Sequence, residues 1–87
     1  MQPDADQIRE AMLRLVSGVR GTRATVLAEA IGGSRSLAEL CELRRPLVQA
    51  LTADRGELQA LRQMMRVDAM LLEAWPEAPV SRPAVLG

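Results

Sequence analysis

The sequence lacks histidine, phenylalanine and tyrosine, and it has only one tryptophan and one cysteine in 87 residues. Without histidine, the commonest general base and metal ligand is missing. The single cysteine, Cys41, excludes an internal disulfide and leaves too few ligands for a zinc site. Beside Leu40 and Glu42 it is expected to be a small buried hydrophobe. The sequence therefore predicts a protein that is not an enzyme and that holds no metal and no cofactor.

An excess of charge of one sign and long apolar runs are also missing. The 11 basic residues, all of them arginine, balance 11 acidic residues. Because nucleic-acid affinity is mostly electrostatic, this balance argues against a protein whose main ligand is nucleic acid. No apolar run approaches the ~20 residues of a membrane span, and the acidic start of the chain (Asp4, Asp6) is unlike a signal peptide. We expect a cytoplasmic protein without membrane contact.

What the chain does contain is mostly leucine, alanine, methionine, arginine, glutamate and glutamine, which favour helix, so the predicted fold class is all-α. Asp4 with Gln7 forms a capping box that begins a first helix. Steps of three and four residues then separate the positions of an apolar stripe, Ile8, Met12, Leu15, Val19, Thr22 and Val26, of which only Thr22 is polar. Although Gly18 and Gly21 weaken its middle, the spacing favours one helix over about 4–31.

The clearest helix breaker is Gly32-Gly33-Ser34. After it, Ser36 with Glu39 forms a second capping box and begins a helix predicted over about 36–75. Folded about this breaker, the two helices form an antiparallel hairpin with coiled-coil-like packing.

The second helix carries a heptad repeat, and nine of its twelve seam positions are apolar. The seam positions are Leu37, Leu40, Arg44, Leu47, Leu51, Asp54, Leu58, Leu61, Met65, Asp68, Leu72 and Trp75. Pro46 is expected to kink the helix. Residues 52–56 could instead form a turn, and a small three-helix bundle is then the alternative. Prolines in residues 76–87 predict a flexible tail.

In the hairpin, the first helix is too short to cover residues 64–75, although this segment is strongly apolar. Another chain would have to cover it, or else the segment is core in a bundle. Methionine suits surfaces that accept varied partners, and tryptophan is enriched among binding hot spots. The residues predicted to bind a partner helix, or a second copy in a homo-oligomer, are Leu58, Leu61, Met64, Met65, Leu71, Leu72 and Trp75.

Segments 37–51, 57–62 and 69–75 share a rhythm of leucines with charged spacers. In this respect residues 8–75 resemble the small helical chaperones of flagellar (type III) export, although this chain is short and carries Pro46. In that family an antiparallel helical hairpin is followed by an amphipathic C-terminal helix. The resemblance implies that this last helix captures the exposed helical end of a secreted structural subunit.

Residues 27–36, Leu-Ala-Glu-Ala-Ile-Gly-Gly-Ser-Arg-Ser, resemble the middle of a helix-turn-helix unit, as in small terminases and many repressors. This resemblance implies DNA contacts by Arg35, Arg44 and Arg45. Against it, Glu39 and Glu42 would repel a DNA groove. DNA binding is thus the alternative to a module that binds another protein helix.

Overall fold

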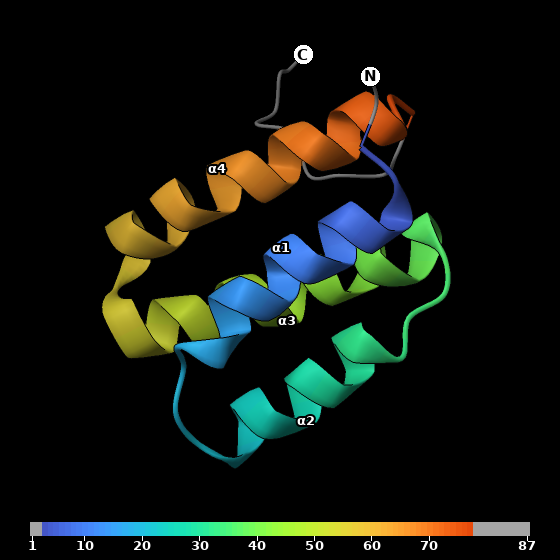
Figure 1. Ribbon diagram of the computed structural model, residues 1–87. Coiled ribbons are helices and arrows are strands. Elements are labelled where there is room, and N and C mark those ends of the chain that lie inside the picture. Colours follow the sequence, from blue (N-terminus) through green and yellow to red (C-terminus); the bar gives the residue numbers. More distant parts are fainter. Residues whose placement is uncertain (1–2, 78–87) are drawn as a thin grey trace.

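A computed structural model describes residues 3–77, and within them it contains four helices and no strand (Figure 1). The helices are α1 (Ala5–Ser17), α2 (Thr22–Gly32), α3 (Leu37–Arg55) and α4 (Glu57–Ala74). The all-α prediction is confirmed. The bundle has four helices instead of the two or three expected from the sequence. Of the predicted flexible tail, residues 78–87 lie outside the described residues.

Helices α1 and α3 form the middle of the bundle, and α2 and α4 lie on opposite sides of them (Figure 1). Each of the two central helices contacts every other helix, whereas α2 and α4 do not touch each other. The core takes one stripe from each helix, at the spacing that puts side chains on one face. It consists of Ile8, Met12, Val16, Ala24, Leu27, Ile31, Leu40, Leu47, Leu51, Ala60, Met64, Val67 and Leu71.

Both predicted capping boxes begin a helix at the expected residue. The Asp4 carboxylate accepts from the Gln7 amide at 2.9 Å, and the Gln7 side chain accepts from the Asp4 amide at 3.0 Å. At α3, the Ser36 hydroxyl accepts from the Glu39 amide at 3.2 Å. The Glu39 carboxylate bonds the amide of Arg35 instead of that of Ser36, so this second box is shifted by one residue.

The prediction of one helix over 4–31 is wrong, because the chain turns between Gly18 and Thr22. Gly21 adopts φ +111°, a conformation that side chains with a Cβ rarely adopt. The interruption also changes which residues face inward. Val16 joins the core in place of Leu15 and Val19, and Val26 is 60% exposed.

The prediction of one continuous helix over 36–75 is wrong, and the alternative break within residues 52–56 is found at Gly56. Helix α3 continues through Pro46. Gly56, with φ +90°, is the single residue between α3 and α4. Its amide donates to the Thr52 carbonyl at 2.9 Å, and its own carbonyl accepts from the Ala60 amide at 3.0 Å. The chain reverses here and α4 packs along α3. The segment 64–75 is therefore not an uncovered overhang but part of a helix that contributes to the core.

Gly56 supports a first prediction. At φ +90° and ψ 162° an L-residue is strained, so Gly56→Ala should lower the free energy of unfolding by about 1–2 kcal/mol. Gly32→Ala is the matched control, because Gly32 is helical and has open space around its Cβ position. It should be neutral or stabilising by up to about 1 kcal/mol. Urea unfolding followed by circular dichroism measures both, and equal effects would contradict the interpretation.

Candidate protein-binding surface

The exposed apolar side chains of the described residues gather on α4. Five large apolar side chains are exposed in residues 3–77, and four of them belong to this helix. Their exposed fractions are 65% for Leu58, 56% for Leu61, 70% for Met65 and 38% for Leu72. Spacings of three, four and seven residues place all four on one face of the helix. We call this set the α4 stripe.

The α4 stripe and the core-facing side of α4 are two different faces of the same helix. The core face consists of Ala60, Met64, Val67 and Leu71, which are all buried. At 3.6 residues per turn, the stripe lies roughly a third of a turn away from them. Its members all come from the heptad seam predicted for the continuous helix. The helix therefore has more apolar surface than the bundle uses.

The structure divides the residues predicted to bind a partner. Leu58, Leu61, Met65 and Leu72 form the exposed stripe. Met64 and Leu71 are instead 1% and 0% exposed and pack in the core, so they cannot contact a partner of the folded bundle. The heptad seam contains the four exposed residues but not Met64 and Leu71, which were predicted because the whole apolar segment 64–75 was expected to lie uncovered.

Trp75, the seventh of the predicted partner-binding residues, is half-buried at the end of α4. It is the C-terminal cap of the helix, and its backbone amide donates to the Leu71 carbonyl at 2.8 Å. The side chain is thus placed beyond the last turn and away from the middle of the stripe.

Arg44 and Asp68, two polar exceptions in the predicted heptad seam, bond to each other and link α3 to α4. The Arg44 Nε lies 2.6 Å from one carboxylate oxygen of Asp68, and its Nη2 lies 2.8 Å from the other. Both side chains are less than a third exposed. The hydrogen bonds that Arg44 donates to the Asp68 carboxylate, opposed by partial burial, raise the pKa of the Arg44 guanidinium. This bidentate pair is the stronger kind of ion pair and is not free to hold a phosphate.

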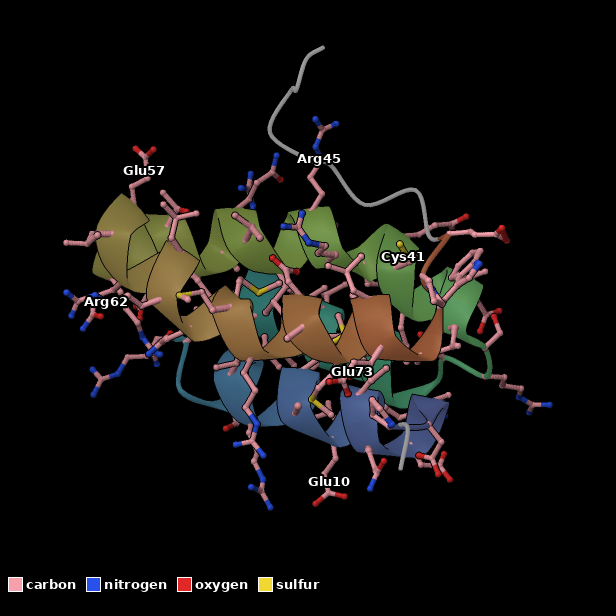
Figure 2. The ribbon with its side chains drawn as sticks, turned by 90° about the horizontal axis from the view of Figure 1, so that it is seen from above. Glu10, Cys41, Arg45, Glu57, Arg62 and Glu73 are labelled. Atoms are coloured by element: carbon pink, nitrogen blue, oxygen red, sulfur yellow. The ribbon has the colours of Figure 1, made fainter. Side chains whose placement is uncertain are left out.

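The three arginines predicted to contact DNA are not brought together as one basic surface. Arg44 is engaged by Asp68. Arg35 lies in the turn before α3, and Arg45 extends from α3 away from the bundle (Figure 2). Glu39 and Glu42 are exposed on the same helix. The arrangement mixes both signs of charge where a DNA-binding helix needs an excess of positive charge.

Beside the α4 stripe, the exposed basic side chains are unpaired. Arg62 follows Leu61 directly and lies one turn from both Leu58 and Met65. In Figure 2 it extends outward from α4. Neither Arg62 nor Arg66 forms an ion pair or a side-chain hydrogen bond with any residue of the described part of the chain. The stripe is therefore bordered by positive charge that has no partner among residues 3–77.

The chemistry of the remaining side chains offers little reactivity. Burial, partly offset by the nearby Arg44, raises the pKa of the half-buried Cys41 thiol, which keeps it protonated and weakly nucleophilic at neutral pH. Within residues 3–77 no cluster of three or more histidine, cysteine, aspartate or glutamate side chains could hold a metal ion.

Comparison with known proteins finds no match. This holds for protein-family models, for curated proteins and for solved structures. The comparisons therefore identify neither an export chaperone nor a small terminase. No helix in the described part of the chain has the length and apolar character needed to cross a membrane.

Proposed function

We propose that this protein is a protein-binding module that holds an amphipathic helix, from a partner or from a second copy of the chain, against the α4 stripe. The observation that supports this function is the alignment of four of the five exposed large apolar side chains on one face of one helix. From Leu58 to Leu72 the stripe is about 21 Å long at 1.5 Å per residue. Apolar anchors at such spacings are what recognition between amphipathic helices requires.

The side chains of the stripe and its border favour a particular kind of partner. Leucine and methionine provide apolar contact, and the flexible Met65 at its centre adapts to different neighbouring shapes. Arg62 and Arg66 lack carboxylate partners within the described residues, so a helix with acidic side chains beside its apolar face fits best. This is also the segment onto which the resemblance to flagellar export chaperones places the capture surface.

The same observations rank protein binding above DNA binding and catalysis. A DNA-binding role would rest on Arg35, Arg44 and Arg45, and the second of these is already bonded to Asp68. A catalytic role would need a reactive group, whereas the thiol of Cys41 is held in its protonated form. The α4 stripe, in contrast, can bind another apolar surface without a reactive side chain.

The second prediction tests the α4 stripe. The double variant Leu58→Glu/Met65→Glu should lose binding, because it puts two charges where apolar surface becomes desolvated. The probe is a designed 21-residue amphipathic helix with leucine at heptad seam positions and glutamate beside them. Fluorescence anisotropy should show an affinity at least tenfold lower, or about 1.4 kcal/mol. Sedimentation velocity should show the loss of any dimer of the unmodified chain.

Gln59→Glu is the matched control for this experiment. It places a negative charge at an exposed position of the same helix but off the stripe. Both proteins should unfold at nearly the same temperature as the unmodified chain, because neither change touches the core. An unmodified protein that neither self-associates nor binds the probe would contradict the proposed function, as would equal affinities of the double variant and the control.

A further inference from the structure

A second apolar surface, a groove between α2 and α3, lies away from the α4 stripe. Its volume is about 690 Å³. One wall is Val26 and Ala30 of α2, and the other is Leu43, Pro46 and Ala50 of α3. Val26 is the one exposed large apolar side chain of the described residues that is not on α4. Exposed Val26, Ala30, Pro46 and Ala53 therefore give the groove an apolar surface that the bundle leaves uncovered.

The groove is open because the side chains along its α3 wall are small or flat. Pro46, Ala50 and Ala53 follow Leu43 at spacings of three, four and three residues, so they share one face of α3. None of these three fills the space beside α2. Val26, Pro46 and Ala53 are exposed, so the groove is open to solvent along its length and is not a closed pocket. A segment of chain can lie in it from the side.

One end of the groove is positively charged. Arg20 and Arg23 line it there, and neither forms an ion pair or side-chain hydrogen bond within residues 3–77. The N-terminus of α2, at the same end, has no side-chain cap and no acidic residue in its first turn. Its free amide groups and the helix dipole add to the positive potential. The one carboxylate in the lining, Asp54, is bonded by the Arg55 Nε at 3.1 Å.

We propose that this groove binds an acidic amphipathic helix of a partner protein. Its apolar side chains would pack between Val26 and the Leu43–Pro46 wall, and its carboxylates would pair with Arg20 and Arg23. The 11 residues of α2 give a groove about 16 Å long, which matches three turns of helix. The site is separate from the α4 stripe, because α2 and α4 lie on opposite sides of the central helices (Figure 1).

Charge complementarity decides the kind of occupant. A nucleic acid would find only two cations beside an apolar surface, which is too little charge for phosphate-driven affinity. A single acyl chain would leave the open wall of Val26, Pro46 and Ala53 in contact with water. A helix with apolar and acidic faces covers the wall and also neutralises both arginines.

The test uses two 14-residue peptides that form the same amphipathic helix with leucine on one face. One carries two glutamates near one end, and the other carries glutamine at those positions. Fluorescence anisotropy at low salt is measured with the Leu58→Glu/Met65→Glu variant, in which the α4 stripe is expected not to bind a helix. The glutamate peptide should bind at least tenfold more tightly than the glutamine peptide, and added salt should reduce this difference. Amide shifts in NMR spectra of the full chain should change along α2 and residues 43–54 of α3.

Variants separate this groove from the α4 stripe. Arg20→Gln/Arg23→Gln should abolish the preference for the glutamate peptide, and Val26→Asp should abolish binding of both peptides. Each change is made in the same Leu58→Glu/Met65→Glu background. Arg45→Gln is the control, because Arg45 is an exposed cation of α3 outside the groove lining, and it should leave both affinities unchanged. Circular dichroism checks that each variant unfolds at the temperature of the unmodified protein.

Three results would overturn the proposal. The first is equal binding of the two peptides, which would remove the role of the arginines. The second is a set of amide shifts confined to α4, which would place the peptide on the stripe. The third is binding of decanoate in the groove by a protein that binds neither peptide, which would indicate a site for a small anionic lipid.

Discussion

Leu71→Ala should lower the free energy of unfolding by about 2–5 kcal/mol, whereas Leu72→Ala should change it by less than about 1 kcal/mol. The two leucines are neighbours on α4, but Leu71 is 0% exposed and Leu72 is 38% exposed. Removing a fully buried leucine side chain loses its burial and leaves a cavity. Shortening the Leu72 side chain loses less burial and leaves no closed cavity, because part of this side chain already contacts water. In an 87-residue chain whose total stability is on the order of 5–10 kcal/mol, the first change is severe.

Urea unfolding of the two variants measures this difference directly. The helix propensity of alanine is the same at both positions, so it does not contribute to the difference. Met64→Ala and Met65→Ala form a second matched pair on the same helix, with one methionine in the core and one in the stripe. If the variants of each pair lose equal stability, the placement of the stripe on the outside of α4 is wrong.

In each of these two pairs, we expect the variant with the smaller effect on stability to have the larger effect on binding affinity. Truncation of Met65 or Leu72 should weaken the interaction with an amphipathic helix and leave the fold intact. A variant at Met64 or Leu71 that still folds should keep the unmodified affinity, because neither side chain reaches the surface. Stability and binding thus separate the two faces of α4.

The second large effect concerns the Arg44–Asp68 pair. Asp68→Asn should lower the free energy of unfolding by about 1–3 kcal/mol, because it leaves the largely buried guanidinium of Arg44 without its counter-charge. The double variant Arg44→Met/Asp68→Leu should recover most of this loss, since apolar side chains of similar size need no partner at this site.

A double-mutant cycle built from Arg44→Met and Asp68→Leu measures the coupling between the two side chains. Asp54→Asn is the control, because Asp54 pairs with its own neighbour Arg55 on the same helix and does not join two helices. It should cost less than about 1 kcal/mol. A coupling energy near zero for Arg44 and Asp68 would show that the pair does not hold α3 against α4.

Several local features of this fold could be predicted from the sequence. Asp4 with Gln7 and Ser36 with Glu39 mark the starts of α1 and α3, because capping depends on residues within one turn. The break after Gly32 follows from local propensity in the same way. The two mistaken long helices share one cause: a glycine within a helix costs only up to about 1 kcal/mol, so a sequence pattern alone does not tell whether Gly21 and Gly56 continue a helix or end it.

The candidate site was predictable only in part, for a related reason. The heptad spacing found Leu58, Leu61, Met65 and Leu72 as an apolar face of one helix, but the predicted hairpin left all of residues 64–75 uncovered, including Met64 and Leu71, which the structure places in the core. The sequence marked Arg44 and Asp68 as polar exceptions in the seam, 24 residues apart, without indicating that they meet. Their pairing requires the reversal at Gly56.

The sequence by itself was sufficient for the helical fold class, the two capped helix starts and the scarcity of reactive side chains, because each depends on composition or on residues one turn apart. Only the tertiary structure decided which face of α4 is covered. That helix has two apolar faces, and its periodicity describes both equally well. The turn at Gly56 sets the rotation of α4 against α1 and α3, so Met64 and Leu71 enter the core while Met65 and Leu72 remain outside.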